Sequence, residues 1–63
     1  MNGQPLKLLL VDDERLARAE LRRLLASHVQ GGAVKIVGEA VSAADAIAQI
    51  GKLRPDLLLL DVQ

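Results

Sequence analysis

The fold of this chain is decided by the stretch Leu6-Lys7-Leu8-Leu9-Leu10-Val11-Asp12-Asp13-Glu14, an apolar run that ends abruptly in three acids. A continuous apolar run of this length is typical of a strand that is buried on both faces, as in a parallel sheet. Acids placed directly after such a strand lie at its carboxyl end, where open parallel sheets bind their ligands. The stretch therefore predicts both a parallel sheet and the place of a functional site.

Two further apolar runs, Val34–Val37 and Leu57–Leu60, repeat the strand pattern. Between the three runs, apolar residues at helical spacing predict one helix from Glu14 to about Ser27 and another from about Ala43 to Leu53. Successive parallel strands joined by helices follow right-handed crossovers. We therefore expect an α/β fold with three parallel strands in the order 2-1-3 and one helix on each face, which is the first half of a doubly wound sheet.

Each predicted helix has an apolar stripe that we expect to face the sheet. The members on the first helix are Leu16, Ala17, Leu21, Leu24 and Leu25, and on the second Ala43, Ala44, Ile47 and Ile50. The arginines of the first helix lie on its opposite side, and they are Arg15, Arg18 and Arg22. The second helix opens with a capping box, in which Ser42 is the cap and Asp45 reaches back.

Composition excludes several functional classes. The 63 residues are enough for one small domain at most, and the absence of cysteine excludes disulfides and cysteine-based zinc or redox sites. Eight basic residues balance eight acidic ones, and Phe, Tyr and Trp are absent, so this segment offers neither a basic nor a stacking surface to nucleic acid. No apolar run approaches the ~20 residues needed to cross a membrane, and no signal peptide is visible, so we expect a cytoplasmic protein.

A second acidic position is Asp61, which follows the third strand directly. If the first and third strands are neighbours, their ends lie about 5 Å apart, so Asp12, Asp13 and Asp61 converge. Clustered carboxylates repel one another unless a cation neutralises them, and a hard divalent cation with oxygen ligands suits this set. The alternative is that Asp12 to Glu14 only cap a helix and that Asp61 is a turn residue. The position of both groups at one sheet edge favours the metal site.

Other nucleotide and hydrolase sites lack their required residues. A P-loop needs G-x-x-x-x-G-K-[ST] after the first strand, and a dinucleotide site needs G-x-G-x-x-G there; the chain has neither. Without those glycines, Glu39 after the second strand is interpreted as a solvated loop charge rather than a ribose ligand. His28 is the single histidine, and no Ser–His pairing is apparent, so a hydrolase nucleophile is unsupported.

Taken together, three stretches resemble the response-regulator receiver domain of two-component signalling. They are Leu8 to Glu14, Val37 to Ala40 and Pro55 to Gln63, so the resemblance extends over nearly the whole chain. The segment from Asp12 to Leu25, with the ending Leu60-Asp61-Val62-Gln63, is most similar to receivers attached to LytTR-type DNA-binding domains. Receivers have the flavodoxin-like fold, so the resemblance implies that residues 1–63 are a partial receiver domain, truncated after the third strand.

The resemblance also implies a role for each acid. Asp61 matches the phosphoacceptor, a nucleophile toward phosphohistidine or a small acyl phosphate. Asp13 matches the direct Mg²⁺ ligand and Asp12 its neighbour, and Gln63 matches the residue whose backbone carbonyl completes the metal site. The implied partner is a sensor histidine kinase, with DNA bound only through a missing output domain that controls transcription. The implied activity is that of a phosphoacceptor, not of a turnover enzyme.

The chain departs from the family in its length. A complete receiver is about twice as long, near the common domain size. Missing with the later strands are the family's switch Ser or Thr and its phosphate-binding Lys. We therefore keep an alternative, that this chain is a non-phosphorylatable fragment or a protein-interaction module that self-associates through the exposed edge of the third strand.

Overall fold

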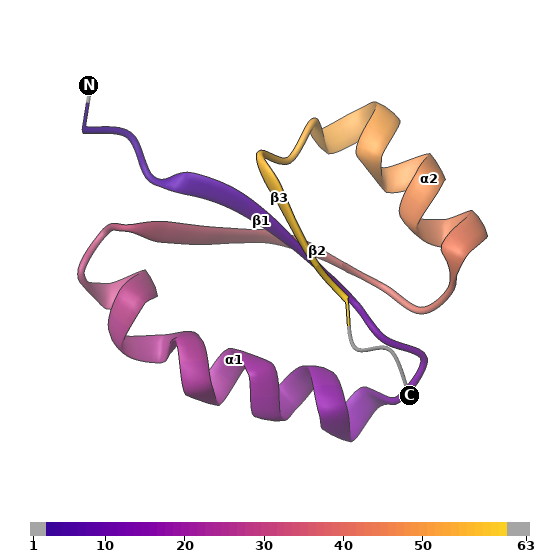
Figure 1. Cartoon of the computed structure of the whole chain (residues 1–63), viewed down its shortest axis with the longest axis horizontal. Coiled ribbons are helices and arrows are strands. Elements are labelled where there is room, and N and C mark those ends of the chain that lie inside the picture. Colours follow the sequence, from indigo (N-terminus) through magenta and orange to yellow (C-terminus); the bar gives the residue numbers. More distant parts are fainter. Residues whose placement is uncertain (1–2, 61–63) are drawn as a thin grey trace.

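The computed structural model describes residues 3–60 and places five elements in the predicted order. They are β1 (Leu6–Val11), α1 (Arg15–Gln30), β2 (Val34–Ala40), α2 (Ala43–Leu53) and β3 (Leu57–Leu60). The strands form one parallel sheet in the order β2-β1-β3. Figure 1 shows α1 and α2 on opposite sides of the strands. The predicted class, strand order and helix placement are therefore confirmed.

The core is built around β1, the central strand. Leu9 and Leu10 are fully buried, and Leu8 and Val11 are nearly so. Because alternate residues of a strand point to opposite faces, Leu9 and Val11 share one face, where they cluster with buried residues of β2 and α2. The central strand thus supplies apolar side chains to both faces of the sheet, as its continuous apolar run predicts.

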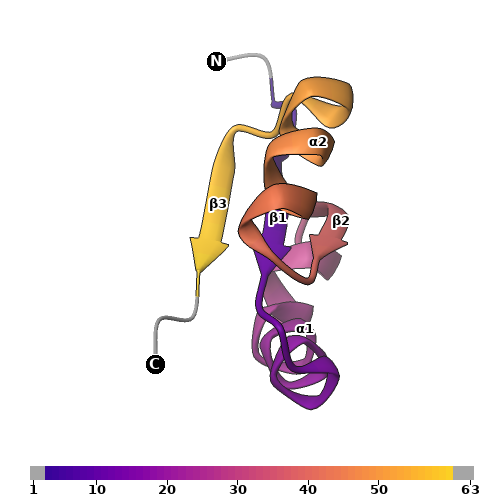
Figure 2. The same cartoon turned by 90° about the vertical axis from the view of Figure 1, so that its right-hand side faces the viewer.

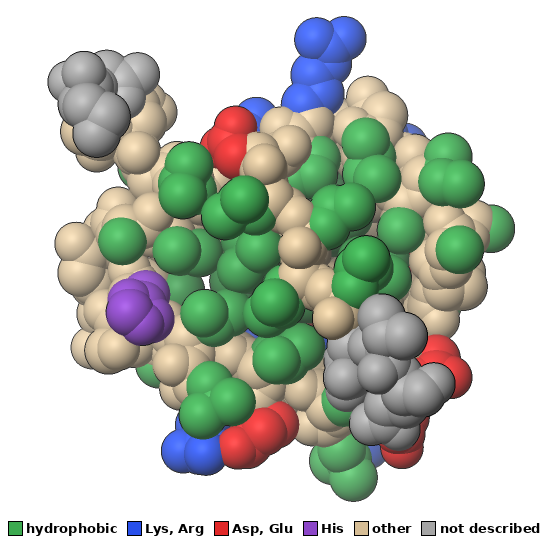
Figure 3. Space-filling view, viewed as in Figure 1, with side chains coloured by type: hydrophobic (Ala, Val, Ile, Leu, Met, Phe, Trp, Pro, Cys, Tyr) green, Lys and Arg blue, Asp and Glu red, His purple; other side chains and the backbone are tan. Residues whose placement is uncertain are grey.

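The edge strand β3 differs from this prediction. It pairs with β1 alone, and within residues 3–60 neither helix contacts it. Figure 2 shows β3 standing apart from both helices, and in Figure 3 hydrophobic side chains gather on the face where it lies. Three of its four leucines are exposed: Leu57, Leu58 and Leu60. The apolar run alone suggests burial on both faces, whereas half of a receiver sheet is expected to leave one edge unpaired and its uncovered faces exposed. The structure agrees with the second expectation, because no helix among the described residues covers β3.

The helix α2 turns a different face to the sheet from the one we expected. Ala46 is its buried residue, with Leu53 partly buried against the core, whereas Ile47 is 71% exposed. The helix α2 lies close to β2 at Gly38, and the small side chain of Ala46 is the one that packs into the core there. The capping prediction is confirmed, because the Ser42 hydroxyl accepts a hydrogen bond from the N–H of Asp45 at 3.1 Å. The Asp45 carboxylate reaches back to the N–H of Val41 at 3.0 Å.

Gly38 makes this close approach possible. It lies at a register shift, where Leu8 pairs with Ile36 but Leu9 pairs with Gly38, so β2 carries an extra residue. A Cβ at Gly38 would lie 2.6 Å from the Gln49 side-chain oxygen and 2.9 Å from a Leu53 methyl. Glycine here therefore sets the distance between strand and helix.

We expect Gly38→Ala to destabilise the fold by about 1–3 kcal/mol, because Gln49 and Leu53 must both move to admit the methyl group. Gly51 is the matched control, since it lies in α2 with nothing within 4 Å of its virtual Cβ. Gly51→Ala should instead stabilise by about 0.5–1 kcal/mol through helix propensity. Urea unfolding followed by circular dichroism measures both. Equal effects of the two substitutions would contradict the packing role of Gly38.

Candidate functional site

Three acids lie together at the carboxyl end of β1. Asp12 is buried with 7% of its surface exposed, and Asp13 and Glu14 are exposed. A carboxylate oxygen from each lies within 4.8 Å of those of the other two. Several oxygens at this spacing are the donor set that a hard divalent cation takes, so the residues fit Mg²⁺. The structure thus brings Asp12 and Asp13 together as predicted, with Glu14 beside them.

Backbone contacts hold this acidic loop, which we define as residues 12–14. The N–H of Asp12 donates to the carbonyl of Ala40 at 3.0 Å, which ties the loop to the end of β2. One carboxylate oxygen of Asp12 accepts the N–H of Glu14 at 2.8 Å. Glu14 is the N-cap residue of α1, but its own side chain makes no capping hydrogen bond. Helix capping therefore accounts for little of the acidity here, and the side chains of Asp13 and Glu14 extend into solvent.

A pair of arginines corrects two expectations: that Glu39 is a solvated loop charge, and that Arg18 and Arg22 lie on the side of the first helix away from the sheet. Glu39 is not a solvated loop residue: it lies in β2, and its carboxylate accepts from Arg18 at 2.8 Å and also from Arg22. Arg18 in addition donates to the backbone carbonyl of Asp12 at 2.6 Å. Sequence reasoning missed these ion pairs because the two arginines lie in α1 and Glu39 lies in β2, which are separate elements of the chain. The spacing of the arginines did indicate that they could bind one partner together, since Arg18 and Arg22 are one helical turn apart and therefore neighbours on the helix surface.

The two arginines hold the pKa of Glu39 below its ordinary value of 4.5, with the hydrogen bond from Arg22 the largest cause and that from Arg18 acting in the same direction. A carboxyl group with a lowered pKa in the folded state stabilises the fold at pH values above 4.5. That contribution is lost as the pH falls through the lowered pKa of the folded protein.

We expect Glu39→Gln to be less stable than the wild type at pH 7, by about 1–2 kcal/mol. The difference should shrink below pH 4.5 and vanish once Glu39 is protonated in the folded wild type. Thermal unfolding from pH 7 to pH 3 measures this. Glu20→Gln is the control, because the Glu20–Arg23 pair is exposed on α1 and contributes little. A pH-independent difference between wild type and Glu39→Gln would contradict the ionic role.

Asp61 and Gln63 lie outside the described residues, so their placement stays a prediction. The structure nevertheless describes the residue before Asp61. Leu60 pairs with Val11, which is the residue before Asp12. The strands that precede the two acids are thus adjacent and in register at their carboxyl ends. This register is what the prediction of converging carboxylates requires.

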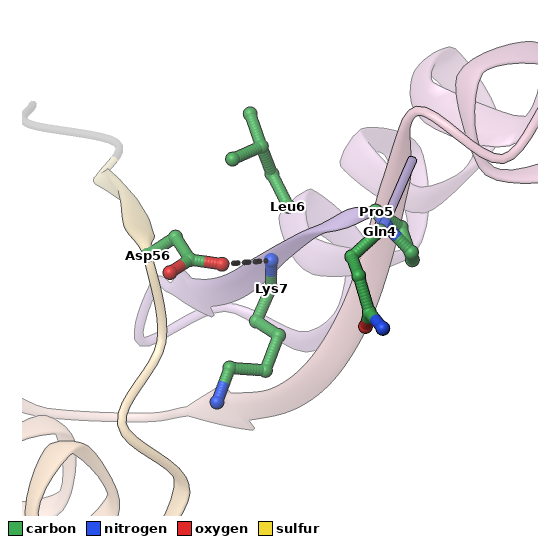
Figure 4. Close-up of a pocket in the computed structure, with 5 residues that line it drawn as sticks. All are labelled: Gln4, Pro5, Leu6, Lys7 and Asp56. Carbon is green, nitrogen blue, oxygen red and sulfur yellow. Dashed lines mark hydrogen bonds between the residues drawn. The ribbon is translucent and has the colours of Figure 1, made fainter. Parts of the chain in front are cut away.

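A pocket at the opposite end of the sheet is separate from this site. It is lined by residues at the start of β1 and before β3: Gln4, Pro5, Leu6, Lys7 and Asp56. Figure 4 shows the Asp56 carboxylate accepting the backbone N–H of Lys7, at 2.8 Å. This contact fixes the entry of β3 beside β1. The pocket therefore belongs to the anchoring of the edge strand, not to the acidic loop.

Comparison with known proteins identifies relatives but no matching family model. The chain is 50% identical over 58 residues to the transcriptional regulatory protein BtsR of Salmonella typhi, which covers 92% of this chain and 23% of that protein. An uncharacterised response regulatory protein of Vibrio cholerae is 43% identical over 58 residues, which are 92% of this chain and 23% of that protein. The sensory transduction protein LytT of Bacillus cereus is 47% identical over 92% of this chain and 22% of its own length.

The chain thus spans about a quarter of the length of these relatives. No helix within residues 3–60 is both long enough and apolar enough to span a membrane. The aligned part of each relative amounts to 58 residues, nearly the whole of this chain, so the similarity includes the sheet and the acidic loop together.

Proposed function

Because 92% of this chain is 43–50% identical to a transcriptional regulatory protein, a response regulatory protein and a sensory transduction protein, we propose that it is a phosphoacceptor receiver segment of a LytTR-type response regulator, in which Asp61 accepts a phosphoryl group. The observation that carries the proposal is the register of the central and edge strands. Val11 and Leu60 are paired, and each is followed directly by acid. A nucleophilic carboxylate beside a cation-binding pair is the arrangement that phosphoryl transfer needs.

The chemistry divides between the acids. A carboxylate oxygen of Asp61 attacks phosphorus, forming an O–P bond while the P–N bond of phosphohistidine breaks and the imidazole leaves. Asp12 and Asp13 would hold Mg²⁺, and the backbone carbonyl of Gln63 would serve as a further ligand. When bound, the ion supplies positive charge that offsets the carboxylates and the transferring phosphoryl group. The segment accepts one phosphoryl group rather than turning over a substrate, so it acts as a signalling domain and not as an enzyme.

The proposal includes the partners of the longer protein. A sensor histidine kinase supplies the phosphoryl group, and DNA is bound by an output domain outside these residues, so that phosphorylation controls transcription. Support comes from the homology to regulators named for transcription and sensory transduction. This segment itself contacts neither nucleic acid nor membrane in the proposal, and its location is the cytoplasm.

Labelling with a small acyl phosphate tests the proposal directly. We expect incubation of the chain with acetyl phosphate and Mg²⁺ to add one phosphoryl group, detected by intact mass, and peptide mapping to place it on Asp61. Removing the cation with EDTA should abolish labelling, because Asp12 and Asp13 then repel the incoming phosphate. Labelling that persists without a divalent cation would argue against the metal-dependent mechanism.

The edge strand favours a second function, self-association. β3 has one free edge within the described residues, and three of its leucines are exposed. An uncovered apolar edge strand is a template for pairing with another chain. In this reading the chain is a non-phosphorylatable module that dimerises through β3. Sedimentation over a concentration series distinguishes the two: a reversible dimer that Leu58→Lys disrupts supports the module, and a monomer at all concentrations excludes it.

A further inference from the structure

The side chain of Arg18 joins three parts of the fold. It projects from the first turn of α1, only 12% of it is exposed, and its Nε donates to Glu39 of β2 at 2.8 Å. Its Nη1 donates to the backbone carbonyl of Asp12 at 2.6 Å. One guanidinium thus spans α1, β2 and the acidic loop, and each of its contacts uses a different nitrogen.

The contact at Asp12 completes a set of restraints on the acidic loop. The N–H of Asp12 is held by Ala40, its carboxylate by the N–H of Glu14, and its carbonyl by Arg18. The first joins two backbone groups, and the second is local to the loop, from the backbone N–H of Glu14 to the carboxylate of Asp12. The third depends on one side chain and on Glu39, which holds that side chain in place. Within residues 3–60, Arg18 is therefore a side chain outside the loop whose removal takes away one of the loop's supports.

We propose that Arg18 is a positioning residue, which holds the acidic loop in the conformation that binds a divalent cation, with Glu39 as its anchor. This inference rests on the proposed function, because the cation serves phosphoryl transfer there. Arg18 does not touch the reacting atoms. Groups that orient metal ligands from outside commonly change metal affinity by about tenfold or more when they are removed.

Removing Arg18 should change the affinity for a divalent cation in opposite directions, depending on whether its charge or its positioning of the acidic loop matters more. A free cationic side chain near the site would repel a metal ion, so its loss would tighten binding. Here, however, the guanidinium is bound to the carboxylate of Glu39, which offsets its charge. Positioning should therefore dominate, and the sign of the change in affinity separates the two effects.

The experiment compares wild type, Arg18→Ala and Arg22→Ala in ¹H–¹⁵N spectra, with and without Mg²⁺. Arg22 is the matched control, because it also binds Glu39 but is 49% exposed and makes no hydrogen bond to the acidic loop within residues 3–60. Without the cation, we expect Arg18→Ala to lower the heteronuclear NOE at the amides of Asp13 and Glu14, with no change in Arg22→Ala. With the cation, Arg18→Ala should weaken Mg²⁺ binding about tenfold. Peak dispersion in the same spectra shows that each variant is folded.

Arg18→Lys provides a second variant, which keeps the charge and most of the side-chain length. A single ammonium lacks the planar fork that reaches Asp12 and Glu39 at once, so its affinity should stay below that of the wild type. An acidic loop as rigid in Arg18→Ala as in the wild type would overturn the inference whether or not Mg²⁺ binds. Unchanged or tighter Mg²⁺ binding in Arg18→Ala would do the same. A wild type that binds no Mg²⁺ while its loop depends on Arg18 would count against the proposed function instead.

Discussion

Leu9→Ala is expected to remove about half of the chain's free energy of unfolding at 25 °C. Leu9 is fully buried in the central strand and packs with residues of β2 and α2. Truncating a buried leucine to alanine costs about 2–5 kcal/mol, from lost burial and the cavity that remains. A domain of this size has a total stability of about 3–9 kcal/mol, at about 0.05–0.15 kcal/mol per residue. The loss is therefore about half of that total.

Circular dichroism during urea unfolding measures this effect, since the chain has no Trp or Tyr to report by fluorescence. Leu24→Ala is the matched control, because Leu24 is 59% exposed on α1. That substitution should change the free energy of unfolding by no more than about 0.5 kcal/mol. If the two variants unfold at similar urea concentrations, β1 is not the centre of the core.

Asp61→Ala should abolish phosphorylation by acetyl phosphate, both in this chain and in any longer protein that contains it. The substitution removes the carboxylate that forms the O–P bond, and no other acid follows a strand that pairs with β1 at the same end of the sheet. Asp13→Ala should reduce labelling through loss of a cation ligand, and its defect should be overcome in part by raising the Mg²⁺ concentration. In Asp61→Ala, by contrast, raising the Mg²⁺ concentration should not restore labelling.

Asp56→Asn is the control for this experiment. Asp56 precedes β3, so it lies at the end of the strand opposite to Asp61, and the asparagine oxygen preserves the acceptor for the N–H of Lys7. Its labelling should equal that of the wild type. Retained labelling of Asp61→Ala at another residue would overturn the assignment of the phosphoacceptor, while leaving the sheet and the acidic loop as described.

The sequence predicts the strands and the acids well, because their signals are local. A short apolar run bounded by charge predicts a strand at Leu6–Val11 and Leu57–Leu60, and both ranges match the structure. Position relative to those strands then predicts that Asp12 and Asp13 lie at one sheet edge. Apolar runs alone do not show how many faces of a strand are covered. The exposure of β3 agrees with the expectation for half of a receiver sheet, because coverage depends on the whole set of helices rather than on the strand itself.

The errors involve contacts between distant elements. Isoleucines in α2 suggested its buried face, but α2 lies close to β2 at Gly38, and Ala46 occupies the contact instead. Likewise, nothing local to Glu39 indicates that Arg18 and Arg22 bind it across the gap between β2 and α1. Hydrophobic periodicity identifies a helix or a strand. The residue that a charged or small side chain contacts is set by tertiary packing instead.

The central position of β1 has a consequence for how the chain is made. β1 is synthesised first, yet its partners are both distant in sequence: Leu6 pairs with Val34, and Leu8 with Leu57. Pairings with large sequence separation form slowly, because a long loop must close before any contact forms. A nascent chain leaving the ribosome therefore carries its most deeply buried strand without one of its two partner strands until the second crossover is complete. The strand that organises the finished sheet is the segment that most needs a chaperone during translation.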